Sequence, residues 1–281
     1  ALFMHGAGFT GSGEKNIAPK AALKLHSDCT VEILVANTEM GQGAMTALSR
    51  IVANALSIPL SRVRYPLPET SRVPNSGPTV ASRTTMIIGR TLELCAADLL
   101  KAERGKEAVF ERQYDFPPDQ VWDEKTYTGS AYAVFSWGAV AVEVEIVMAT
   151  IEVAPKEMWL AYEIGRAVNP AAARGQLEGG TIQALGYGLL EKMDIKNGGY
   201  LQDRLQTYII PTSADVPEIH TRIIEIPYSR GPGGAKGIGE LPMNGMAAAV
   251  RNAVRHALGI AINSIPVTPE KILECLRRRD A

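Results

Sequence analysis

The sequence predicts an α+β fold in which mixed sheets pack against helices in two subdomains, residues 1–125 and 126–281. Segments with alternating apolar residues, as in strands, are interspersed with segments whose apolar residues recur at helical spacing. The spacing between them is irregular, which argues against regular strand–helix–strand crossovers and a purely parallel sheet.

The first predicted subdomain opens on a strand-like start, Ala1 to Met4, and continues with two strands between Lys20 and Asn37 around a turn at residues 27–29. Apolar residues at helical spacing predict a helix over 43–56. A loop rich in proline follows, and a second helix is predicted over 84–101 before a charged stretch that ends near residue 126.

The second predicted subdomain begins with a strand hairpin over 131–153 and a further strand over 159–164. Asn169-Pro170 is a typical helix start, and small and apolar residues extend the predicted helix to Leu189. A strand over 219–226, a helix over 243–258 and a last helix that begins at Thr268-Pro269-Glu270 complete the chain.

Charge and cysteine content exclude several classes of protein. With 29 basic and 30 acidic residues, the chain offers no charge-based reason to bind nucleic acid or an acidic membrane. We find no apolar run that could span a bilayer and no signal peptide, and the scattered Cys29, Cys95 and Cys275 indicate a reducing, cytoplasmic setting. Neither these cysteines nor the four histidines have the spacing of metal ligands, so no protein-held metal is expected.

Four segments place polar, uncharged side chains among small residues where a helix is about to begin. A helix start carries unpaired N–H groups that favour anions, and glycine lets a ligand approach the backbone. If the four segments meet in the folded protein, they would together hold a large phosphate-bearing ligand. Each segment alone is also consistent with an ordinary turn, an N-cap or a surface helix. The four polar segments are residues 39–43, 78–85, 174–180 and 231–240.

Glu240 ends the last of these segments and precedes the apolar Leu241-Pro242-Met243. Burial among such neighbours would raise the pKa of this carboxyl and make the carboxylate a stronger proton acceptor, which suits a general base. The alternative is a glutamate that stabilises a helix N-terminus. Gly6 to Gly11 satisfies the dinucleotide-binding pattern G-x-G-x-x-G, but Pro19 and a strand pattern follow where that motif requires a helix. We therefore reject a nucleotide-binding dehydrogenase domain.

The four polar segments, together with the run from Val73 to Ser82, resemble the C-terminal half of the molybdenum-binding subunit of the xanthine dehydrogenase and aldehyde oxidoreductase family. The resemblance extends over nearly the whole chain. It implies that Gln42 and Gln176 hydrogen-bond a pterin cofactor and that Glu240 is the catalytic base next to the metal. The other residues to which it assigns cofactor binding are Gly41, Gly43, Ala81, Ser82, Thr84 and Thr85. Phe9 corresponds to an aromatic ring against the substrate, although its loop differs from the family pattern.

This resemblance implies a molybdenum-dependent oxidoreductase that hydroxylates an electron-poor carbon of a purine- or xanthine-like heterocycle. The cofactor would be molybdopterin with molybdenum, as such or as the cytosine dinucleotide, and the protein itself would supply no metal ligand. The family's N-terminal half, its 2Fe-2S clusters and its FAD are expected on partner subunits. Alternatives are a nicotinate or aldehyde dehydrogenase of the same family, or a non-catalytic assembly subunit.

Overall fold

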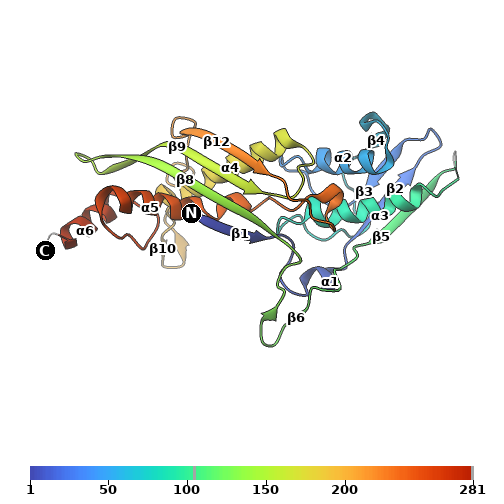
Figure 1. Cartoon of the computed structure of the whole chain (residues 1–281), viewed down its shortest axis with the longest axis horizontal. Coiled ribbons are helices and arrows are strands. Elements are labelled where there is room, and N and C mark those ends of the chain that lie inside the picture. Colours follow the sequence, from blue (N-terminus) through green and yellow to red (C-terminus); the bar gives the residue numbers. More distant parts are fainter. Residues whose placement is uncertain (104–105, 280–281) are drawn as a thin grey trace.

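The computed structural model describes residues 1–103 and 106–279, and it contains two four-stranded sheets at opposite ends of an elongated molecule (Figure 1). The first sheet has the order β4-β3-β2-β5 and the second has the order β1-β8-β9-β12. Mixed sheets with helices packed on them confirm the predicted α+β fold. The strands of the first sheet are β2 (Lys20–Leu25), β3 (Val31–Leu34), β4 (Val63–Arg64) and β5 (Ala108–Gln113). Those of the second are β1 (Leu2–Gly6), β8 (Phe135–Val147), β9 (Glu152–Glu163) and β12 (Glu218–Ile224).

Helices α2 (Ala44–Leu56) and α3 (Gly89–Leu99) pack against the first sheet. Their apolar stripes meet the apolar face of β2 and β3 in a core that includes Leu23, Ile33, Leu48 and Leu92, all nearly inaccessible to solvent. Periodicity predicted both helices because each buries a single stripe. The predicted β2–β3 hairpin is also present.

Helices α4 (Pro170–Leu189) and α5 (Met246–Leu258) cover one face of the second sheet. The buried side of β9 contributes Met158, Leu160 and Tyr162 to this core, whereas Trp137 and Trp159 lie exposed on the uncovered face of the sheet. The last helix, α6 (Pro269–Arg279), closes a third, smaller core beside α5. Its predicted start at Pro269 is confirmed.

Shorter elements connect these units. They are α1 (Gly13–Ile17), the two-stranded pairs β6 (Trp122–Asp123) with β7 (Thr128–Gly129) and β10 (Ile195–Lys196) with β11 (Gly199–Tyr200), the π-helix η2 (Thr84–Ile88) and the 3-10 turns η1 (Leu60–Arg62), η3 (Pro232–Gly234) and η4 (Leu241–Met243). No helix among the described residues is both long and apolar enough to cross a bilayer.

Three details differ from the sequence-based expectation. The predicted hairpin over 131–153 and the strand over 159–164 form one long hairpin, because Pro155 sits beside a register shift that lets β9 continue past a proline. The predicted helix over 84–101 begins as the π-helix η2 and ends at Leu99. A five-residue helix does follow Gly11, but β1 and β2 belong to different sheets, so the strand–helix–strand unit of a dinucleotide site is absent from this part of the chain.

Strand β1 joins the second sheet, antiparallel to β8, although it comes first in the sequence. A strand from the first predicted subdomain thus pairs with a strand from the second. The boundary between the two subdomains at residue 125 stays a prediction. The pairing has a consequence for the site, since it places His5 and the residues after it between the two sheets. The charged stretch after Lys101 includes residues 104–105, which lie outside the described residues.

Candidate active site

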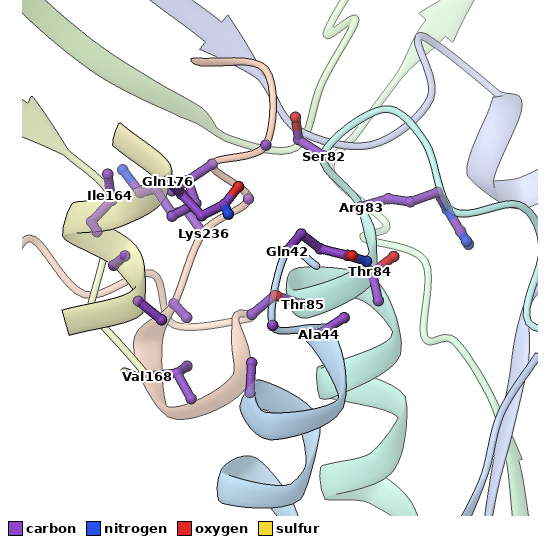
Figure 2. Close-up of a pocket in the computed structure, with 18 of the residues that line it drawn as sticks. Gln42, Ala44, Ser82, Arg83, Thr84, Thr85, Ile164, Val168, Gln176 and Lys236 are labelled. Carbon is purple, nitrogen blue, oxygen red and sulfur yellow. The ribbon is translucent and has the colours of Figure 1, made fainter. Parts of the chain in front are cut away.

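A cavity of about 400 Å³ lies between α2 and η2 on one side and α4 on the other (Figure 2). All four polar segments contribute to its walls. The cavity-lining residues among those predicted are Gln42, Gly43, Ala81, Ser82, Thr84, Thr85, Gln176 and Glu240. Gly41 lies next to this wall without being part of it, and Phe9 lines a neighbouring cavity. The fold thus gathers side chains that are separated by up to 198 positions in the sequence.

The segment before α2 satisfies its own hydrogen bonds. The Glu39 carboxylate accepts from the backbone N–H groups of Gly41, Gly43 and Met45 at 2.8, 3.0 and 2.9 Å. Burial alone would raise the pKa of Glu39, but these backbone donors hold it below its usual value. Glu39 therefore already accepts from the Met45 N–H in the first turn of α2, which leaves fewer backbone donors at this helix start for an external anion.

The Gln42 amide is also engaged within this segment. Its Oε1 accepts from the backbone N–H of Met40 at 2.8 Å, and its Nε2 donates to the backbone oxygen of Thr38 at 2.9 Å. A hydrogen bond from Gln42 to a ligand would therefore use a remaining amide hydrogen or oxygen lone pair, or replace one of these bonds.

Residues 78–85 are held by a buried ion pair. Arg83 is inaccessible to solvent, and its Nε and Nη2 donate to the two carboxylate oxygens of Glu14 at 2.8 and 2.9 Å. Its Nη1 donates to the backbone oxygens of Ser76 and Pro78. Arg83 consequently points away from the cavity (Figure 2), and the segment presents Ser82, Thr84 and Thr85 to it instead.

Segment 174–180 lies inside α4, so the expectation that a helix begins at this segment is wrong. The helix begins earlier, where the Asn169 side chain caps it by accepting from the Ala172 N–H. The backbone donors around Gln176 are therefore used inside the helix. Gln176 instead projects toward the cavity beside Lys236 (Figure 2). The cap residue Asn169 and the small Ala172 and Ala173 of α4 also line the cavity.

Two glycines of segment 231–240 are required by close backbone packing. A Cβ at Gly237 would lie 1.9 Å from the Ser82 backbone oxygen, and one at Gly231 would lie 1.9 Å from that of Ala235. Lys236 was not predicted as a site residue. It is buried in the cavity wall, where its Nζ donates to Glu163 at 2.6 Å and to the Phe135 backbone oxygen at 3.0 Å.

Glu240 lines the cavity, and its carboxylate is hydrogen-bonded to Ser82. The Ser82 hydroxyl donates to Glu240 Oε2 at 3.0 Å and accepts from the Glu240 backbone N–H at 2.9 Å. Ser82 is therefore not the N-cap that one alternative supposed; the start of η2 has no side-chain cap. The Glu240 side chain is 56% exposed, so the predicted burial of this carboxylate is wrong for the chain as described.

Sequence reasoning missed His5. Its Nε2 lies 3.1 Å from Ser82 Oγ and 3.4 Å from Glu240 Oε2, and its Nδ1 lies 3.4 Å from Asn244 Nδ2. Desolvation lowers the pKa of His5, although Glu240 opposes that shift. No spacing in the sequence marks this histidine, because its partners depend on the pairing of β1 with β8. We call His5, Ser82, Glu240 and Asn244 the Glu240 cluster.

Phe9 lies beside the Glu240 cluster, in a smaller cavity that Glu240, His5 and Tyr132 also line. The Phe9 backbone N–H donates to Glu14 at 3.2 Å, so the Arg83–Glu14 pair fixes this loop as well. The part assigned to Phe9 toward a substrate stays a prediction. Within the parts of the chain that the structure describes, no three His, Cys, Asp or Glu side chains form a group that could hold a metal ion.

A family model described as the molybdopterin cofactor-binding domain matches residues 1–111 and 102–217. The chain belongs to this family. The resemblance to the xanthine dehydrogenase and aldehyde oxidoreductase family that the four polar segments predicted is therefore confirmed.

The relatives are considerably longer than this chain. It is 30% identical to a probable xanthine dehydrogenase subunit of Bacillus subtilis (strain 168), over 99% of its own length and 42% of the relative's. It is also 30% identical to the aldehyde oxidoreductase of Megalodesulfovibrio gigas, of which it spans 32%. The solved structure of the aldehyde oxidoreductase from Desulfovibrio gigas superposes with a TM-score of 0.87 at 26% identity, covering 99% of this chain and 32% of that one.

Proposed function

We propose that this chain is the C-terminal half of the molybdopterin-binding subunit of a molybdenum hydroxylase. The enzyme would introduce a water-derived oxygen at an electron-poor carbon of a purine- or xanthine-like heterocycle. The observation that supports this most directly is a single cavity that joins all four polar segments and has one carboxylate, Glu240, among its lining residues.

The residues present fit the cofactor. Gly43 lines the cavity with open space where a side chain would stand, and the small Ala172 and Ala173 line it from α4. Of the three basic residues that line the cavity, Arg83 and Lys236 pair with carboxylates of their own, so the polar groups most available to a pterin are amides, hydroxyls and the Arg166 guanidinium. Gln42, Gln176, Thr84 and Thr85 would hold molybdopterin, as such or as its cytosine dinucleotide. When bound, it would supply the two-electron redox chemistry at molybdenum.

Glu240 would act as the general base. Its carboxylate stands at the cavity wall in a fixed position, because Ser82 binds both its Oε2 and its backbone N–H. From there it would take the proton of the water-derived nucleophile as the substrate carbon is attacked. Phe9, in the adjoining cavity, would hold a flat substrate ring by contact with its own ring.

The proposal includes partner subunits that carry the N-terminal molybdenum half, the 2Fe-2S clusters and the FAD, in a cytoplasmic complex. Two observations support it. The chain spans 42% and 32% of the length of two relatives. Large apolar side chains also lie exposed between the end of α4 and residue 210, among them Tyr187, Leu205 and Ile210, and a surface of this kind commonly marks an interface.

The deciding experiment compares the purified complex with its Glu240→Gln variant. We expect unchanged molybdenum content and a fall in kcat of about 10²-fold or more, because the amide cannot accept the proton. Glu274→Gln, an exposed change on α6, is the matched control and should leave both values unchanged. Near-normal turnover in Glu240→Gln would refute the role of base, and a complex that contains this chain but no molybdenum would favour an assembly subunit.

An aldehyde is the second candidate substrate class, since the chain matches an aldehyde oxidoreductase in both sequence and structure. A steady-state screen of purines, nicotinate-like heterocycles and aldehydes on the intact complex separates the two. A higher kcat/KM for aldehydes would replace the heterocycle in this proposal and leave the remainder intact.

A further inference from the structure

The Ser82 hydroxyl is saturated with hydrogen-bond partners. A hydroxyl has one hydrogen to donate and two lone pairs to accept with. Its hydrogen goes to Glu240 Oε2 at 3.0 Å, and one lone pair accepts from the Glu240 backbone N–H at 2.9 Å. The remaining lone pair faces His5 Nε2 at 3.1 Å.

This count determines which nitrogen of His5 carries hydrogen. While Ser82 donates to an ionised Glu240, it can only accept from His5, so Nε2 must be the protonated nitrogen of the ring. The other side of the ring agrees, because Nδ1 faces the Asn244 amide nitrogen at 3.4 Å and an unprotonated Nδ1 can accept from it. The ring is thus in contact with Ser82 on one side and with Asn244 on the other.

We propose that His5 is a positioning residue for Glu240: it donates to Ser82, and Ser82 in turn holds the carboxylate and the backbone of Glu240 in the geometry that proton abstraction needs. This rests on the proposed function only in that Glu240 is taken as the base. The coupling of His5 to Glu240 is a property of the described chain itself.

The surroundings of His5 favour its neutral ring. Glu240 is the charged group that faces it, and Tyr132 is the other titratable group lining the same small cavity. Burial lowers the pKa of His5 and Glu240 raises it in part. The neutral ring is therefore favoured, and it keeps its hydrogen on the nitrogen that Ser82 needs.

A first experiment measures His5 without any catalysis. Exchange of the imidazole C2 hydrogen with deuterium depends on ring protonation, and mass spectrometry of a peptide that contains His5 but not His26 gives its pKa in the intact complex. We expect this pKa to fall in Glu240→Gln, since the variant removes the negative charge that raises it. The His256 peptide, from the exposed end of α5, should not change and is the internal control.

A second experiment tests the effect on turnover. In the molybdenum-loaded complex, His5→Phe keeps a ring in place but removes the donor to Ser82, and kcat should fall by about 10²-fold, the effect of a misplacement near 1 Å. His5→Gln keeps an N–H donor and should recover at least half of that loss on a logarithmic scale. Molybdenum content and KM should stay close to wild type in both, and His256→Gln is the matched control.

The outcomes separate this inference from the function on which it rests. An unchanged His5 pKa in Glu240→Gln, or normal kcat and an unchanged pH profile in His5→Phe, would overturn the inference while Glu240 remained the base. If Glu240→Gln is fully active but still shifts the His5 pKa, the coupling is correct and the proposed base is wrong. Loss of molybdenum in His5→Phe but not in His5→Gln would also overturn it, because the ring would then act on cofactor retention.

Discussion

Gly237→Ala should separate the two sides of the candidate active site. The added Cβ would lie 1.9 Å from the Ser82 backbone oxygen, about 1.5 Å short of ordinary contact, and 2.7 Å from the Ala7 side chain. Both obstacles belong to backbone or to a one-carbon side chain, so neither can rotate away. The loop that carries Glu240 must therefore retreat from Ser82, at a cost of about 1–3 kcal/mol for overpacking.

Gly239→Ala is the matched control, because the nearest atom to its Cβ would be Ser82 Oγ at 3.4 Å, an ordinary contact. We would measure thermal unfolding of the full chain in its complex and the molybdenum-loaded kcat of both variants. Gly237→Ala should unfold at a lower temperature and lose about 10²-fold in kcat, because a displacement of 1 Å at a reacting group has about that effect. Equal stability of Gly237→Ala and wild type, or equal damage in Gly239→Ala, would refute the packing argument.

Three further predictions concern the groups around the site. Glu14→Gln should destabilise the fold by about 3–5 kcal/mol in denaturant unfolding, because Arg83 would stay buried without its carboxylate. Adding Arg83→Met should recover part of that loss, and a double variant whose destabilisation equals the sum of the two single variants would contradict this. The pKa of His5 is lower in the folded chain than in the unfolded chain, so below about pH 6.5 the unfolded chain binds more protons. The free energy of unfolding should therefore fall as the pH is lowered there, and it should fall more steeply in wild type than in His5→Gln. Burial raises the pKa of Cys95 to about 12, so a maleimide should label exposed Cys29 in the native protein and Cys95 only after unfolding; early labelling of Cys95 would contradict this.

Several elements could be predicted because one local pattern specifies each of them. Helix α2 buries a single apolar stripe, and α4 begins at Asn169-Pro170, where a capping side chain is followed by a residue with no N–H to lose. The long β8–β9 hairpin could not be delimited, since Pro155 interrupts the strand pattern and only a register shift beside it makes the proline tolerable.

The candidate site divides in the same way. Gln42, Ser82, Gln176 and Glu240 were found from motifs, which depend on residue type and order. The motifs did not show that Glu39 fills the start of α2 or that Glu240 is still half exposed, because both depend on which groups lie nearby in space.

By itself, the sequence determined the α+β class, most helix starts and the family to which the chain belongs, since these follow from periodicity, capping residues and motifs read along one stretch at a time. The tertiary structure alone decided that β1 pairs with β8, that His5 meets Ser82 and Glu240, and that Arg83 and Lys236 turn to carboxylates of their own. The Arg83–Glu14 and Ser82–Glu240 contacts join residues 69 and 158 positions apart, and no local pattern encodes them because their partners meet only when folding brings distant segments together.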